Sequence, residues 1–178
     1  EPSYFAGCRI QGEATQVVKC VRTDTEEIIG MGARSTAMAW VDGQPERIGY
    51  LSDLRLDRKY RGGLLVARGY RVLRALHEAD PVPFYTTVIY EGNDPARSAL
   101  VGARAGLPVY KDWGRILTPA IRLDFPVRQA PVPRVMIERG SRERFADIVT
   151  FINREAKKNQ FAAVYRSEDF IDGRFAGV

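Results

Sequence analysis

The chain has 178 residues, of which 45% are hydrophobic and 28% charged, and its formal net charge is +5. This length suits one well-packed core rather than two complete domains. No apolar run approaches the roughly 18 residues of a membrane-spanning segment, so we expect no membrane partner. The basic residues are spread along the chain, which argues against nucleic acid as the partner. A basic RNA-associated protein stays open as a weaker alternative.

The two cysteines, Cys8 and Cys20, have neither the spacing of a zinc site nor the density of a disulfide scaffold. We therefore expect reduced thiols in a cytoplasmic protein. A single histidine, His77, and the lack of a carboxylate cluster in the sequence predict that no metal is bound. No leader segment is visible and the first residue is not Met, so we expect the chain to be a piece of a longer protein.

Three strands are predicted over 15–22, 27–41 and 46–57, because these stretches are rich in β-branched residues and alternate in part with polar ones. Asp42-Gly43 lies between the second and third strands and is a strong hairpin signal. The three strands should form an antiparallel meander.

An amphipathic helix is predicted over 65–79. It should end before Asp80-Pro81, because proline disfavours the helical conformation of the residue before it. One side of this helix should carry the apolar residues Leu65, Val72, Leu73, Leu76 and Ala79.

The stretch 84–90, rich in aromatic and β-branched residues, predicts a buried central strand. A short helix should follow, capped at Asn93 and closed at Gly106. Two more strands are predicted over 107–113 and 115–123. This order of elements predicts an α/β (α+β) fold, with a mixed, mostly antiparallel sheet flanked by helices.

Residues 125–133 are rich in proline and show neither a helical nor a strand period, which predicts a semi-rigid linker. We expect a first domain over 1–124 and the start of a second strand-helix unit over 134–178. That unit should contain a strand over 135–140 and a helix capped by Ser141.

The stretch RLDRKYRGGLLVARGY runs from the third predicted strand through a basic turn into the long helix. The turn contains Arg61, Gly62 and Gly63, preceded by the cations Arg58 and Lys59. Glycines leave backbone N–H groups uncovered, and a helix N-terminus favours an anion in front of it. Neither a Walker ending nor a GxGxxG fingerprint is present. The turn therefore predicts a phosphate-bearing ligand other than ATP or NAD.

Two runs, IGYLSDLRLDRKYRGGLLVARGYRVLRALHE and FYTTVIYEGNDPARSALVGARAGLPVYKDWGRI, resemble the central part of the GNAT N-acetyltransferase superfamily. The resemblance covers about residues 15–122. It implies a GNAT-like sheet, acetyl-CoA as co-substrate, and direct transfer of an acetyl group to an amine in a ternary complex. It also implies that the N-terminal elements of such a domain are missing before residue 15. The unit over 134–178 either supplies them or, as we expect, begins a second GNAT-like domain.

The same resemblance implies where acetyl-CoA binds. The backbone of the strand Leu54, Arg55 and Leu56 would pair with the pantetheine arm, and Asn93 would contact that arm from the following helix. The pyrophosphate would lie at the turn formed by Arg61, Gly62, Gly63, Leu64 and Leu65.

Acetyl transfer to an amine needs a base for the ammonium proton and an acid near the departing thiolate. Asp53 is the nearest carboxylate to the expected cleft and is the candidate base. Tyr110 is the candidate acid, because Leu100 stands where the family often has a tyrosine. The acceptor, a small-molecule or protein amine, should approach over Arg34 and Ser35 beside these two groups.

One alternative from another class is a catalytically silent GNAT-like module that binds CoA or a partner protein within a larger chain. The spacing of Gly62-Gly63 and the leucine at position 100 both depart from the family pattern and support this alternative. CoA binding without turnover would distinguish the module from the enzyme. We also consider a homodimer.

Overall fold

The computed structural model describes residues 4–101, 106–120, 134–136 and 140–175. Its centre is a five-stranded sheet in which β1, β2, β3 and β4 lie in that order and β5 also pairs with β2. Within the described residues no helix is long and apolar enough to cross a membrane. The strands are β1 Ala14–Val21, β2 Ile28–Val41, β3 Gln44–Leu56, β4 Tyr85–Thr86 and β5 Phe161–Ala163.

The predicted meander is confirmed. Strand β2 pairs antiparallel with β1 on one side and with β3 on the other. The β2–β3 hairpin turns at Asp42 and Gly43, which have φ values of 48° and 76°. Two consecutive positive φ angles characterise the turn that suits the twist of a hairpin, and Asp-Gly adopts it readily.

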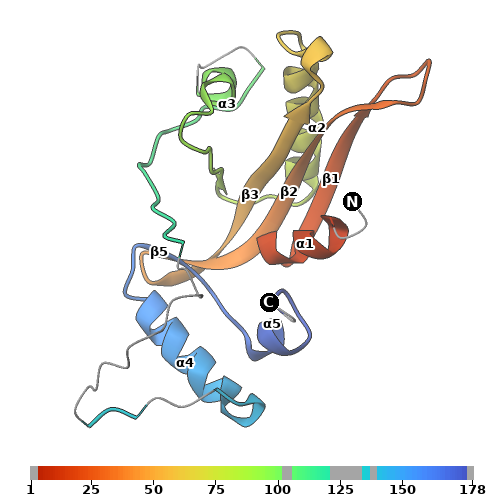
Figure 1. Cartoon of the computed structure of the whole chain (residues 1–178). Helices are drawn as coiled ribbons and strands as arrows, with labels where there is room; N and C mark the ends of the chain where they lie inside the picture. The colour runs from red at the N-terminus through yellow and green to blue at the C-terminus, as the bar shows by residue number, and fades with distance from the viewer. Residues whose placement is uncertain (1–3, 102–105, 121–133, 137–139, 176–178) are drawn as a thin grey trace.

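Helices α1, Tyr4–Gln11, and α2, Leu65–Ala79, cover opposite faces of this sheet (Figure 1). Two adjacent residues of β2, Ser35 and Arg34, point to the two faces of the sheet. The Ser35 hydroxyl hydrogen-bonds with Thr15, whose hydroxyl also donates to the Cys8 carbonyl of α1, whereas the Arg34 side chain reaches Asp80 at the end of α2. Helix α1 was not predicted from the sequence.

Helix α2 has the predicted bounds but a different buried side. Val72 is 48% exposed and Ala79 is exposed as well, so these two do not face the sheet. The side chains that line the space between helix and sheet are Leu65, Val66, Tyr70 and Leu73, together with Gly69. The predicted apolar side was rotated relative to the observed one because Val66, Gly69 and Tyr70, which face the sheet, were not counted among the apolar positions.

The predicted buried central strand over 84–90 is wrong. Only Tyr85 and Thr86 pair with β3, in parallel, and Val88 and Tyr90 are 52% and 83% exposed. High β-propensity reflects side-chain packing on a pleated surface, and here the chain leaves β3 after two residues.

The strands predicted over 107–113 and 115–123 are also wrong where the structure describes them: residues 107–120 contain no strand, and 121–123 lie outside the described part. Trp113 still attaches this segment to the sheet, because its ring packs edge-on against Phe84 and Phe161. The aromatic side chain of this segment therefore packs against the sheet, although the backbone of the segment forms no strand.

Helix α3 spans Asp94–Leu100 and begins at Asn93 as predicted, but it ends well before Gly106. Near the C-terminus lie α4, Phe145–Ala156, and α5, Ser167–Ile171. A 3-10 helix over residues 142–144 separates α4 from Ser141, which makes no side-chain cap hydrogen bond. The expected strand over 135–140 is not formed at Val135 and Met136, and 137–139 lie outside the described residues.

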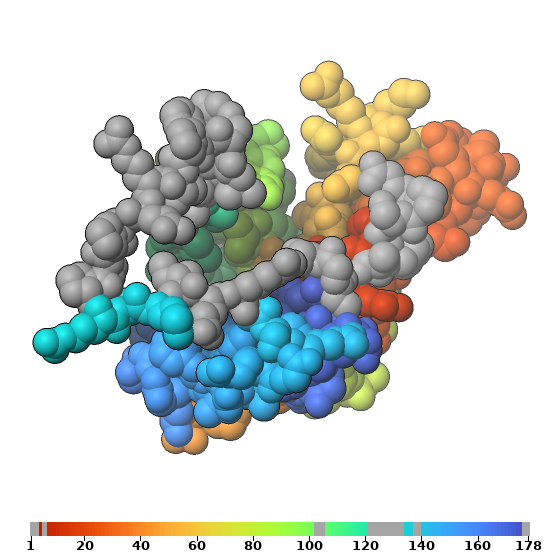
Figure 2. Space-filling model, turned by 60° about the horizontal axis from the view of Figure 1, so that its bottom comes forward, coloured from red at the N-terminus to blue at the C-terminus, as the bar shows by residue number. Residues whose placement is uncertain are grey.

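The C-terminal elements attach to the end of the sheet that bears the hairpin. Strand β5, which was not predicted, pairs antiparallel with residues 39–41 of β2. Asn153 of α4 donates to the Tyr165 carbonyl at 2.7 Å and accepts from the Tyr165 amide at 3.0 Å. Figure 2 shows α4 and α5 packed together at this end of the molecule. The division into two domains around a linker over 125–133 stays a prediction.

A partly exposed ion cluster around the buried Arg34 ties the end of α2 to the sheet. Arg34 has a side chain only 2% exposed, and it donates to Gln16, Tyr85 and Asp80. Arg47 of β3 donates to both carboxylate oxygens of Asp80, at 2.6 and 2.8 Å. These hydrogen bonds, first from Arg47 and then from Arg34, lower the pKa of Asp80 to about 2, against a smaller opposing effect of burial.

This pKa predicts an acid-dependent loss of stability. Because the folded pKa is lowered, the contribution of Asp80 is fully present above its unfolded pKa of about 3.9 and disappears as the pH falls towards about 2. Urea unfolding across this range should show a loss that Asp80→Asn flattens and that Glu78→Gln, in an exposed ion pair with Arg74, does not. Parallel curves for all three proteins would contradict the assignment.

Candidate active site

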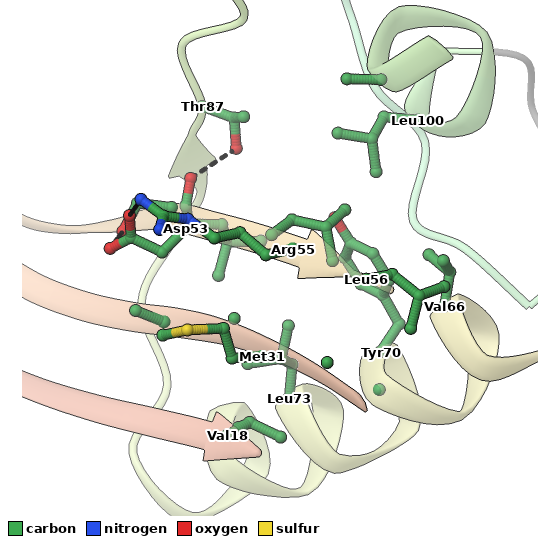
Figure 3. Close-up of a pocket in the computed structure, with 18 of the residues that line it drawn as sticks. Val18, Met31, Asp53, Arg55, Leu56, Val66, Tyr70, Leu73, Thr87 and Leu100 are labelled. Atoms are coloured by element: carbon green, nitrogen blue, oxygen red, sulfur yellow. Dashed lines mark hydrogen bonds and ion pairs between the residues drawn. The ribbon is translucent and has the colours of Figure 1, made fainter. Parts of the chain in front are cut away.

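A pocket of about 360 Å³ opens beside β3, between helix α2, the chain after β4, and α3 (Figure 3). It is lined from four sides by residues far apart in the sequence. The sheet contributes Val18, Cys20, residues 30–33 and residues 51–56; α2 contributes Leu65, Val66, Gly69, Tyr70 and Leu73; the remainder are residues 87–90, Asn93, Ala96, Leu100 and Tyr110.

The pocket exists because β3 and β4 diverge. Their parallel pairing is limited to Gly49 with Tyr85 and Tyr50 with Thr86. Immediately beyond it, the Thr87 hydroxyl donates to the Leu51 carbonyl at 3.1 Å, where a continued strand would have placed a backbone N–H. The part of β3 from Leu51 onward therefore borders the pocket instead of another strand.

A β-bulge shapes the same part of β3. Met31 pairs with Arg55 and Ala33 with Ser52, so β3 has one residue more than β2 between these pairs. Asp53 lies in the bulge with a φ of 55°, a conformation uncommon for a residue other than glycine. Bulges bend a strand and redirect its side chains, and they are frequent beside active sites.

The carboxylate of Asp53 is held from the side of α1. Its Oδ2 atom accepts from the Tyr4 hydroxyl and from Gln11 Nε2, both at 3.2 Å, and Ser52 Oγ lies 3.4 Å away. Its Oδ1 atom is 3.9 Å from an Arg55 nitrogen, beyond hydrogen-bond distance. The side chain is 18% exposed. Oδ1 therefore forms an ion pair with Arg55 and has no hydrogen bond to another described residue.

Burial, and then the charge of Asp53, raise the pKa of Tyr4 above its ordinary value. The phenol therefore stays protonated and continues to donate to Asp53. Tyr4 and Gln11 were not recognised from the sequence, since no local pattern connects the first residues of the chain to a bulge forty positions later.

On the α2 side of the sheet, the Tyr110 hydroxyl lies 2.6 Å from the Tyr70 hydroxyl and 3.5 Å from Thr87 Oγ1. Burial, and then the neighbouring Tyr110, raise the pKa of Tyr70. Tyr70 was not recognised as a site residue from the sequence, although it belongs to the side of α2 that faces the sheet. The three hydroxyls form a short chain that leads into the pocket.

The basic turn connects β3 to α2 at one end of the pocket. Gly62 has a φ of 85°, and an added Cβ at either Gly62 or Gly63 would meet no atom within 4 Å. Arg61 Nε donates to the Leu56 carbonyl at 3.1 Å. Helix α2 begins without a side-chain cap at Leu64, so no side-chain cap occupies the N–H groups of its first turn.

The predicted site residues are brought together in part. Leu54, Arg55, Leu56, Leu65, Asn93 and Tyr110 line one pocket with Asp53. Arg61, Gly62, Gly63 and Leu64 do not line it, but they connect Leu56 to Leu65, which do. Asn93 accepts a hydrogen bond from the Ala96 amide at 3.3 Å and so caps α3 as well as lining the pocket.

The predicted acceptor path over Arg34 and Ser35 is wrong. Arg34 is 2% exposed and Ser35 is fully buried, and both side chains are hydrogen-bonded within the sheet. Asp53, in contrast, lines the pocket. Among the described residues, no three His, Cys, Asp or Glu side chains are arranged to hold a metal ion.

No family model matches the sequence, and a search of curated proteins found no match. Solved structures do match. A mutant of the BH1408 protein from Bacillus halodurans is 22% identical, over 67% of this chain and 74% of its own, with a TM-score of 0.52. A transcriptional regulator from Bacillus halodurans C-125 is 11% identical, over 68% of this chain and 77% of its own, with a TM-score of 0.53. An aminoglycoside 6'-N-acetyltransferase from Acinetobacter haemolyticus is 9% identical, over 67% of this chain and 79% of its own, with a TM-score of 0.50.

The chain therefore has the fold of the GNAT acetyltransferases, which confirms the predicted fold class and, at the level of the fold, the resemblance. Similar folds carry different activities, so the activity has to be argued from the pocket itself.

The turn itself can be tested through its backbone. Gly62→Ala should lower the free energy of unfolding by about 1 kcal/mol, because a left-handed φ is unfavourable for a residue with a Cβ. Gly63→Ala is the matched control, since Gly63 has no positive φ and its Cβ would be unobstructed. We expect it to stay within about 0.5 kcal/mol of the parent protein in urea unfolding. Equal effects of the two substitutions would contradict the described turn.

Proposed function

We propose that this protein is an acetyl-CoA-dependent N-acetyltransferase that transfers the acyl group directly to an amine. The observation that carries the proposal is the placement of Asp53 and Tyr110 in one pocket, engaged from opposite faces of the sheet. Asp53 is held by α1 residues, and Tyr110 is held by Tyr70 of α2. A base on the acceptor side and an acid on the thiol side are what such a transfer requires.

The residues present fit the co-substrate. The cations Arg58, Lys59 and Arg61 and the uncapped start of α2 suit the phosphates. The edge of β3 that β4 leaves free offers backbone groups to an extended amide-containing arm, as in the addition of a strand to a sheet. The bound co-substrate would supply a thioester carbonyl as the electrophile.

The chain's own residues then have distinct roles. Asp53 Oδ1 takes the proton of the acceptor ammonium, and the neutral amine nitrogen forms a bond to the carbonyl carbon. When the carbon–sulfur bond breaks, Tyr110 gives its proton to the thiolate. The second proton of the nitrogen would pass to the Tyr110 oxygen and restore the phenol. The ammonium thus loses two protons and gains the acyl group; one proton is carried by Asp53, the other appears on the released thiol. Tyr70 orients Tyr110 through their 2.6 Å hydrogen bond.

We further propose that the acceptor approaches from the α1 side, because Asp53 is held by α1 residues and Arg34 and Ser35 are buried. The proposed acceptor is the amine of a small molecule or of a protein, which the acceptor screen distinguishes, and the proposed homodimer is tested by the mass of the protein in solution. A silent CoA-binding module remains the alternative outcome.

Binding is the first test. Calorimetric titration with acetyl-CoA and with CoA should show binding of both, and Arg61→Ala should weaken it by about 10- to 100-fold, as expected for loss of a charged contact to phosphate. Arg142→Ala, an exposed arginine before α4, is the matched control and should change nothing. No binding at millimolar concentration would overturn both the enzyme and the silent module.

Turnover is the second test, measured by thiol release with a panel of amines. Asp53→Asn and Tyr110→Phe should each lower kcat by about 100-fold or more. The defect of Asp53→Asn should shrink as the pH rises, because the acceptor then loses its proton without a base, whereas that of Tyr110→Phe should not shrink in this way. Binding without turnover in the parent protein would favour the silent module.

A further inference from the structure

The pocket extends further than acetyl transfer needs. Its lining reaches Val18 and Cys20 on β1, although the diverging gap that holds Thr87 and Tyr110 lies between β3 and β4. Between β1 and β3 lie two strand spacings, or about 10 Å. This inner part lies under α2. The residues that pair with Val18 and Cys20 on the neighbouring strand β2 are the glycines Gly32 and Gly30. Figure 3 shows Val18 and Leu73 on one side of β3 and Thr87 on the other.

The inner part stays hollow because glycines stand on both of its walls. Gly69 lies at the centre of the sheet-facing side of α2, and an added Cβ there would meet no atom within 4 Å. Across from the helix, a Cβ on Gly32 of β2 would meet only the Ser52 carbonyl, at 4.0 Å. No residue of α2 is buried. An interface between helix and sheet is normally packed without such space.

The chemistry of the hollow is apolar. Its side chains are Val18, Cys20, Leu51, Leu56, Val66 and Leu73. Cavities with walls of this kind stay dry and bind hydrocarbons; an engineered cavity of about 150 Å³ holds benzene. The whole pocket has a volume of about 360 Å³, of which this hollow is the part beyond the edge of β3 proposed for the pantetheine arm, and an acetyl group would fill little of it.

Resting on the proposed function, we propose that the acyl group this protein carries is a medium-length hydrocarbon chain, accommodated in the hollow between α2 and strands β1 and β2. The pocket is continuous from the hydroxyls of Thr87 and Tyr110 to Val18, so the thioester and the chain occupy one cavity. Gly69 and Gly32 determine chain length, because a larger side chain at either position would fill the space.

The test compares octanoyl-CoA with acetyl-CoA by calorimetric titration of the full chain. Each methylene that leaves water strengthens binding by about fourfold, so burial of even two predicts at least about 10-fold tighter binding of octanoyl-CoA. Gly69→Leu should abolish this preference, so that octanoyl-CoA binds no more tightly than acetyl-CoA. Gly69→Ala should keep most of the preference for octanoyl-CoA. Like Gly69→Leu it raises the helix propensity of the position, but it adds only one methyl group to the hollow. Ala75→Leu, on the exposed side of α2, should keep the whole preference for octanoyl-CoA.

Gly32→Val repeats the experiment from the sheet, with a residue that suits a strand, in case Gly69→Leu does not fold. Independently of any variant, octanoyl-CoA should slow alkylation of Cys20 severalfold in the parent protein, while acetyl-CoA should not; the buried Cys8 serves as the internal reference.

Equal affinities for the two thioesters, or an equal loss of both in Gly69→Leu, would overturn the chain-length assignment and leave the transferase proposal standing. Failure of both thioesters and of CoA to bind would instead overturn the transferase proposal itself, and the assignment with it.

Discussion

The unequal pairing of β3 is the constraint on which the site depends. On one side β3 follows β2 almost to its end, through Leu56, and on the other it pairs with β4 over two residues. A strand with one free edge exposes unpaired backbone groups, which natural proteins normally cover. Here a threonine hydroxyl and an arginine side chain satisfy the carbonyls of Leu51 and Leu56, and the space between them stays open. The pocket is what remains when the sheet is interrupted at this place.

The point at which the strands separate is itself anchored. Tyr85, the first residue of β4, accepts a hydrogen bond from Arg34 at 2.8 Å and lies against His77 of α2. Asp80, directly after α2, joins the same arginine. A buried arginine is costly unless its donors are satisfied, and this one reaches a carboxylate, a carbonyl, an amide oxygen and a phenol. The cluster thereby holds the end of α2 and the start of β4 together, and the chains diverge beyond it.

The bulge at Asp53 has the complementary role. It places a carboxylate towards α1 while the neighbouring backbone still borders the pocket under α2. The proposed roles of Asp53 and Tyr110 rest on these contacts, whereas the similarity to solved structures shows the fold alone.

Local signals in the sequence determined the elements that depend on neighbours along the chain. The Asp42-Gly43 hairpin, the bounds of α2 and the Asn93 cap were predictable because turn chemistry, hydrophobic period and capping act within a few residues. The order of strand, turn and helix, which resembles the GNAT pattern, also made it possible to predict that several residues lie near one cleft: Asp53, Leu56, Leu65, Asn93 and Tyr110.

Only the tertiary structure decided where β4 ends, which face of α2 meets the sheet, and that Arg34 and Ser35 are buried rather than exposed to an acceptor. The same holds for Tyr4 and Gln11 at Asp53 and for Tyr70 at Tyr110, since these contacts join residues 49, 42 and 40 positions apart. The stretch 84–90 has the composition of a central strand, but a strand needs a partner along its whole length. That partner is a property of the assembled sheet, which no local pattern specifies.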